Sequence, residues 1–234
     1  MVERRGRLLM ESLSRALRAQ VRVEEAEEEG LRWAAVALVL RGDTLDDAAL
    51  LFIRRAVRVG DPWSGHVAFP GGRRDATDTT LEVTARRETR EELALDLDAE
   101  AELLGVLDDL RPRAASLPSI AVRPFVFRLS RDVELVPNEE VQSTFWVPMS
   151  ALLDPARAVE HVFDRGGVRL RFPAYRWGDD VVWGMTERLV TQLLAVAMSS
   201  SLSSLEQAQQ EQLPQQLQQQ ECSRGKHGSA EASA

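Results

Sequence analysis

The sequence predicts a single α/β domain in which helices pack on a mixed sheet. Three observations lead to this fold class. Short apolar runs of strand length recur along the chain, two longer segments carry apolar residues at helical spacing, and the strand-like runs outnumber the helical ones. The chain has 234 residues, 44% of them hydrophobic, which is enough to bury one core with appended segments.

The first part of the chain predicts one amphipathic helix followed by three strands. Leucines recur at helical spacing among arginines, so we expect this helix to pack on the outside of the domain. Each strand is a short apolar run, with turn residues at 41–43 after the first and at 70–72 after the third. These elements are, in order, a helix at residues 8–17, an acidic break at 24–29 and strands at 33–40, 48–53 and 67–69.

The second part begins with a helix at residues 81–93, where Thr79 and Glu82 have the spacing of a capping box. Strand-like runs follow, and the last periodic segment has an apolar stripe that should close one side of the sheet. These later elements are strands at 103–107, 119–129 and 144–147, a hairpin across 164–167 and a helix at 186–198.

The folded domain is expected to span residues 30–198, after an N-terminal helix and acidic linker at 1–29. Residues 199–234 are rich in serine and glutamine and lack the apolar surface that would offset the entropy of ordering. We therefore expect a disordered tail. A weak polar helix is the alternative, although Pro214 would interrupt it.

Charge and cysteine content exclude several classes of protein. A net charge of -8 lacks the basic field that steers proteins to nucleic acid or anionic membranes. The single cysteine, Cys222, excludes an internal disulfide and a thiolate metal cluster. No apolar run reaches the roughly 18 residues of a membrane span. We expect no nucleic-acid or membrane partner and an intracellular location, with the cytoplasm favoured and an organelle left open; the sequence indicates no oligomeric state.

Three glutamates on the helix at 81–93 carry the chemistry that we expect. Glu88, Glu91 and Glu92 stand in the i, i+3, i+4 relation, so their carboxylates share one helix face. Such clusters usually form a solvated face. Here Arg87 stands four residues before Glu91, close enough to pair with it. The upstream residues Gly71, Gly72, Arg73 and Arg74 combine backbone amides without side chains and positive charge, which suits a phosphate. The cluster therefore predicts a site for Mg²⁺ or Mn²⁺.

This segment resembles the Nudix box, Gly-x5-Glu-x7-Arg-Glu-U-x-Glu-Glu-x-Gly-U, where U is a bulky apolar residue. Residues 87–95 match its helical half, except that Thr89 stands at a U position and Ala94 replaces glycine. In the first half, Asp78 replaces glutamate, and eight residues rather than seven separate it from Arg87. The resemblance implies a Nudix-type α/β/α sandwich and a metal-dependent hydrolase of nucleoside-diphosphate-linked compounds.

The lengthened box and the Phe-Pro-Gly-Gly loop at residues 69–72 resemble the coenzyme A diphosphatase branch of that family. Residues 51–56 and 65–69 match the two ends of the upstream segment of the branch, and Trp183-Gly184-Met185-Thr186 is similar to its Trp-Gly-x-Thr element. The middle, residues 57–64, is one residue too long and lacks an arginine at the expected place. The resemblance implies coenzyme A or acyl-coenzyme A as substrate, with another nucleoside diphosphate derivative or an altered nucleotide as the alternative.

The resemblance also suggests the role of each residue. Glu88, Glu91 and Glu92 are the expected metal ligands, and Gly71, Gly72, Arg73 and Arg74 are expected to bind substrate. Glu91, oriented by Arg87, or Glu140 takes the proton from the attacking water. Glu140 is equally consistent with a solvated acidic turn. The alternative that is not an enzyme is a Nudix module that binds a nucleotide without cleaving it.

A 3'-phosphate on the substrate calls for a guanidinium, and Arg54, Arg55 and Arg58 are available for it. Arg54 and Arg55 are expected on opposite faces of a strand, so at most one of them faces the cleft. We assign Arg55 to substrate binding. The alternative is that these arginines only solvate an edge strand.

Overall fold

The computed structural model of the protein describes residues 2–60, 63–112, 119–165 and 168–199. The elements in these ranges are, in chain order, α1 (Val2–Ala19), β1 (Arg32–Arg41), β2 (Ala49–Arg55), β3 (Val67–Ala68), β4 (Gly71–Arg73), α2 (Leu81–Leu93), α3 (Leu97–Glu100), β5 (Ala101–Val106), β6 (Ile120–Leu129), β7 (Val141–Pro148), α4 (Met149–Leu152), the 3₁₀ turn η1 (Pro155–Arg157), β8 (Ala158–Arg165), β9 (Val168–Trp177), β10 (Asp180–Trp183) and a helix at 184–199.

The main sheet is mixed, as predicted. Its strands follow the order β3-β2-β1-β6-β5, with β4 paired to β1 and β7 paired to β2. The central strands β1 and β6 run parallel, and the other pairs are antiparallel. Parallel strands in the centre of a sheet are covered on both faces, which explains the nearly continuous apolar run of β1.

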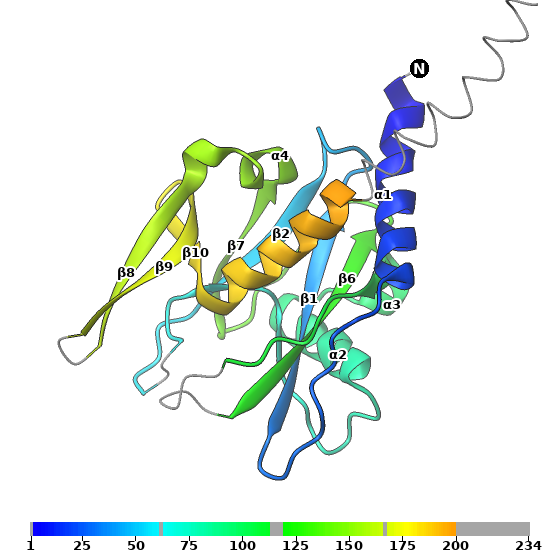
Figure 1. Ribbon diagram of the computed structural model, residues 1–234. Coiled ribbons are helices and arrows are strands. Elements are labelled where there is room, and N and C mark those ends of the chain that lie inside the picture. The colour runs from blue at the N-terminus through cyan, green and yellow to red at the C-terminus, as the bar shows by residue number, and fades with distance from the viewer. Residues whose placement is uncertain (1, 61–62, 113–118, 166–167, 200–234) are drawn as a thin grey trace, which may run out of the picture.

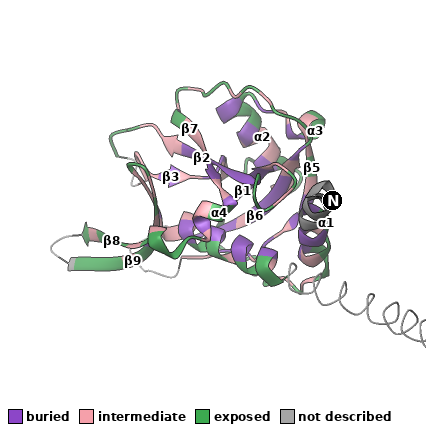
Figure 2. Cartoon of the chain, turned by 90° about the horizontal axis from the view of Figure 1, so that it is seen from above, coloured by how far each residue is buried: buried purple, intermediate pink, exposed green. Residues whose placement is uncertain are grey.

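Helices cover both faces of this sheet and bury two separate apolar clusters (Figure 1). On one face α2 packs against β1 and β4, with Ala35 and Ala37 of β1 beneath it. On the other face Leu38 and Leu40 of β1 join a cluster with α1 and the helix at 184–199. Figure 2 shows the buried residues concentrated between these layers. The predicted α/β/α sandwich is therefore confirmed.

A second, smaller sheet projects from the main body and has the order β10-β9-β8 (Figure 1). Its strands β8 and β9 form the predicted hairpin, with Arg165 opposite Val168. The predicted turn residues 166–167 lie outside the described residues. The short strand β10 was not expected from the sequence. It leads directly into the helix at 184–199, where Thr186 Oγ1 donates a 3.0 Å hydrogen bond to the carbonyl of Val67 in β3.

The bounds of α2 agree with the prediction, but its N-cap differs by one residue. Thr80, not Thr79, is the N-cap, and its side chain accepts a hydrogen bond from the Val83 backbone N–H. The expected capping box is wrong, because Glu82 then lies in the first turn and pairs with Arg86 four residues later. Both consecutive threonines could cap a helix, so residue type alone did not separate them.

No helix in the described ranges combines the length and the apolarity that a membrane span requires. The predicted tail, from residue 200 onward, lies outside the described residues.

Candidate active site

The three glutamates of α2 share one side of the helix, but they differ in exposure. The Glu92 residue is buried, at 3% exposure, and the Glu88 side chain is 18% exposed. The Glu91 side chain is 56% exposed. The three carboxylates thus lie along a gradient from the protein interior to the solvent.

Two glycines of β4 make room for this cluster. The predicted loop at 71–72 is wrong, because Gly71–Arg73 forms a short strand that pairs with β1. The Gly71 N–H donates a 2.9 Å hydrogen bond to Glu92 Oε2. A Cβ at Gly71 would lie 2.3 Å from the Ala35 carbonyl oxygen, and one at Gly72 would lie 2.4 Å from the Glu88 carboxyl carbon. A side chain at Gly71 would therefore meet the backbone of β1, whereas one at Gly72 would displace the Glu88 carboxylate.

The buried carboxylates carry an unfavourable charge. Burial raises the pKa of Glu92 to about 8, and the nearby charges of Glu88 and Glu140 add to this effect. The Gly71 hydrogen bond and the positive charge of Arg55 act in the opposite direction and compensate only partly. Burial also raises the pKa of Glu88, although Arg87 opposes this shift. Without a cation, the surroundings therefore do not fully compensate the ionised form of these carboxyls.

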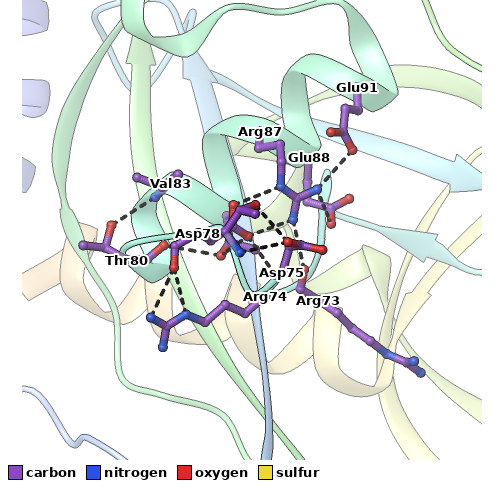
Figure 3. A network of polar contacts seen from close by, with 11 residues as sticks. Arg73, Arg74, Asp75, Asp78, Thr80, Val83, Arg87, Glu88 and Glu91 are labelled. Carbon is purple, nitrogen blue, oxygen red and sulfur yellow. Dashed lines mark hydrogen bonds and ion pairs between the residues drawn. The ribbon is translucent and has the colours of Figure 1, made fainter.

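Arg87 connects the glutamates to the loop before the helix (Figure 3). Its Nη1 lies 3.0 Å from Glu88 and 3.1 Å from Glu91, which confirms the expected pairing with Glu91. Its Nε and Nη2 donate to the two oxygens of Asp78 at 3.0 and 2.9 Å, and Nη2 also donates to the Arg73 carbonyl. One guanidinium thus joins β4, the loop and the glutamate face.

Asp78 is the residue that fixes this arginine, and sequence reasoning missed that role. Its side chain is 2% exposed and also accepts hydrogen bonds from the Asp75 N–H and from Thr84 Oγ1, each at 2.9 Å. These bonds, those from Arg87 first, lower the pKa of Asp78 to about 2. In the Nudix box the position of Asp78 is a glutamate, and this correspondence was the one signal in the sequence that pointed to Asp78.

We expect Asp78→Asn to destabilise the protein at neutral pH by about 2 kcal/mol, from the shift of about two pKa units. The pKa of Asp78 is lower in the folded than in the unfolded state. Its stabilisation is therefore present above pH 4 and is lost as the pH falls from about 4 to about 2. Thermal unfolding from pH 7 to pH 2 should show the curves of the wild type and the variant converging at low pH. A constant difference between them would contradict this assignment.

The remaining predicted residues fall into two groups. Glu140 and Arg55 lie close enough to the cluster for their charges to change the pKa of Glu92. Arg73 and Arg74 are directed elsewhere: Arg74 donates to the carbonyl oxygens of Asp78 and Thr79, and the Arg73 side chain points away from Glu88 and Glu91 in Figure 3. The geometry therefore brings Glu140 and Arg55 to the glutamates, but not the guanidiniums of Arg73 and Arg74.

A divalent cation fits the chemistry of this donor set. Carboxylate oxygens are the ligands that Mg²⁺ and Mn²⁺ prefer, and burial together with mutual repulsion leaves negative charge here that a cation would neutralise. In the part of the chain that the structure describes, no three acidic, histidine or cysteine side chains are already gathered as a metal-holding group. The present contacts give the reason, since Arg87 engages Glu88 and Glu91 while Glu92 faces the Gly71 N–H.

Comparison with known proteins agrees with this geometry. The NUDIX domain family matches residues 30–165. The mitochondrial coenzyme A diphosphatase of Homo sapiens is 37% identical over 146 residues, which cover 59% of this chain and 58% of that protein. An uncharacterized protein of Schizosaccharomyces pombe is 40% identical over 110 residues, which cover 45% of this chain and 33% of that protein. The chain thus matches less than two thirds of the length of either relative.

Among solved structures, an Ap4A hydrolase of Caenorhabditis elegans covers 50% of this chain, and the match spans 80% of that chain at 19% identity and a TM-score of 0.41. A likeness at this level carries no argument about substrate. The family match spans more than half of the chain and includes the whole glutamate helix. The chain therefore belongs to the Nudix hydrolase family.

Proposed function

We propose that the protein is a metal-dependent hydrolase that cleaves a phosphoric anhydride bond in a nucleoside-diphosphate-linked compound. One observation carries this proposal. The carboxyl groups of Glu92 and Glu88 are held in and near the interior, where ionisation without a cation is unfavourable, beside Glu91 and within the electrostatic reach of Glu140. A protein that used these glutamates only as a solvated face would leave them in water, where no such repulsion arises.

Each residue of the site has a distinct task in this mechanism. Glu88, Glu91 and Glu92 would hold Mg²⁺ or Mn²⁺, which supplies charge compensation for the diphosphate and acidifies water when bound. Arg87 orients Glu88 and Glu91, and Asp78 fixes Arg87. Arg55 adds positive charge beside Glu92, where the diphosphate oxygens would lie.

Two carboxylates are candidates for the base that takes the proton from the attacking water. Glu91 is exposed and is held by Arg87. Glu140 is close enough to Glu88 and Glu92 for its charge to affect both, and its Oε1 is 3.1 Å from Arg58 Nη1. Both side chains are partly exposed, so water can reach either carboxylate. We keep both residues as alternatives.

For the substrate we propose coenzyme A or an acyl-coenzyme A, with 4'-phosphopantetheine and adenosine 3',5'-bisphosphate as products. The support comes from the lengthened box, the Phe-Pro-Gly-Gly segment at 69–72 and the similarity to a relative named as a coenzyme A diphosphatase. We further propose an intracellular location and leave an organelle open, since that relative is named as mitochondrial.

The test is a comparison of kcat/KM for coenzyme A, dephospho-coenzyme A and ADP-ribose, each with Mg²⁺ and with Mn²⁺. We expect coenzyme A to exceed ADP-ribose by at least about tenfold, or about 1.4 kcal/mol in transition-state free energy. If ADP-ribose is preferred by that factor, the coenzyme A assignment fails and the hydrolase assignment stands. If none of the compounds, nor any other nucleoside diphosphate derivative, is cleaved, the protein is a binding module.

A further inference from the structure

A cavity of about 330 Å³ is lined by residues of β1, of β4 and of the segment that leads from β4 towards α2, and it is not used by the proposed mechanism. We name it the arginine pocket. Its lining residues are Arg32, Trp33, Arg73, Arg74, Asp75 and Ala76. It adjoins the site through the backbone, because Gly72 packs against the Glu88 carboxylate and the next residue, Arg73, accepts a hydrogen bond from Arg87.

The arginine pocket carries a local excess of positive charge in an acidic protein. Three guanidiniums line it, against one carboxylate, and Asp75 already accepts hydrogen bonds from the Thr77 N–H and Oγ1. Most arginines in the described ranges form an ion pair with an acidic residue. Within the same ranges Arg32 and Arg73 form no ion pair or side-chain hydrogen bond. These two charges are available to an anion.

The strand register places these two arginines together. Ala34 of β1 is paired with Arg73 of β4, and Arg32 lies two residues before Ala34 on the same strand. Residues two apart on a strand point to the same face, and diagonal neighbours on paired strands lie about 7–8 Å apart at the backbone. Long side chains at that spacing can converge on one phosphate group, and guanidinium is the group that binds phosphate in a bidentate manner.

The other arginines considered for phosphate recognition have partners. Arg54 Nη2 lies 2.5 Å from Asp180, and Arg58 pairs with Glu140 at 3.1 Å. A volume of about 330 Å³ is at the small end of the range of about 300–1,000 Å³ for ligand pockets, so the cavity suits one end of a substrate. Trp33, which lies between Arg32 and Ala34 on β1, also lines this cavity, and the Arg123 guanidinium lies over its indole ring.

We propose that the arginine pocket binds a phosphomonoester on the nucleoside part of the substrate, through Arg32 and Arg73. This inference rests on the proposed function, and it names the part of the chain that would distinguish a substrate with a third phosphate from one without it. In coenzyme A that group is the 3'-phosphate of the adenosine.

The test measures binding without turnover. We would titrate the full chain, in EDTA, with adenosine 3',5'-bisphosphate and with adenosine 5'-monophosphate in a calorimeter. The bisphosphate is expected to bind at least about tenfold more tightly, a difference of about 1.4 kcal/mol. The double variant Arg32→Gln/Arg73→Gln should reduce this preference to less than about twofold. The matched control, Arg15→Gln/Arg176→Gln, removes two exposed arginines elsewhere and should keep the preference.

A wild type without the preference, or a double variant that retains it, would overturn the proposal. The kinetic arm uses the same variants, and kcat/KM should fall at least about tenfold for coenzyme A but less than about twofold for dephospho-coenzyme A. An equal loss for both substrates would also overturn it. If neither compound is hydrolysed but the binding preference depends on Arg32 and Arg73, the coenzyme A assignment of the proposed function fails and the pocket assignment stands.

Discussion

Replacing Glu92 with glutamine is expected to lower kcat by at least about a hundredfold while the fold survives. Glutamine keeps the size of the side chain and can still accept the Gly71 hydrogen bond, so the packing between α2 and β4 is retained. It removes the charge that the metal requires. Because burial already raises the pKa of Glu92 to about 8, loss of that charge costs the metal-free protein little stability at pH 7.

The control for this variant is Glu82→Gln on the same helix. Glu82 pairs with Arg86 and lies away from the cluster, so its loss should change kcat by less than about twofold. Thermal unfolding of both variants separates a loss of activity from a loss of folding. Near-normal turnover in a folded Glu92→Gln protein would remove Glu92 from the metal site.

The two adjacent glycines of β4 should respond to alanine in opposite ways. Gly71→Ala is expected to lower the stability by about 3 kcal/mol or more, because its φ of 145° is unfavourable for alanine and its Cβ would meet the backbone of β1. Gly72→Ala should fold, because the group it meets is the flexible end of Glu88. Displacing that carboxylate should lower kcat at least about tenfold. The measurements are the Tm and kcat of each variant.

Gly30→Ala is the matched control for the backbone effect. Gly30 also has a positive φ, 79°, but nothing lies within 4 Å of a Cβ placed there. Gly30→Ala should therefore lower the stability by only about 1 kcal/mol, the conformational part of the effect. If Gly71→Ala is no worse than Gly30→Ala, contact with β1 is not what requires the glycine. If Gly72→Ala leaves kcat unchanged, Glu88 does not need its present position.

Much of this arrangement could be predicted from the sequence because it depends on periodicity. The i, i+3, i+4 spacing of the glutamates and the distance from Arg87 to Glu91 follow directly from helix geometry. The strands β1, β2 and β6 of the main sheet were predicted because their apolar runs are long relative to the turns between them.

What could not be predicted depends on contacts between segments that are separated in the sequence but close in space. The assignment of Gly71 and Gly72 to a strand depends on pairing with β1, which a three-residue segment does not encode locally. Asp78 lies outside the helix, so no helical spacing linked it to Arg87. The strand β10 is short and polar at its start, and it is formed by pairing with β9.

Two adjacent arginines of β2 act on different parts of the protein. Arg54 reaches Asp180 in the projecting sheet, whereas the charge of Arg55 acts on Glu92, and the register between β2 and β7 shifts between these two residues. Through Arg54, β2 contacts the smaller sheet, and through Arg55 it adds positive charge near Glu92. One strand thus links the projecting sheet and the glutamate helix, which belong to different sheets and layers.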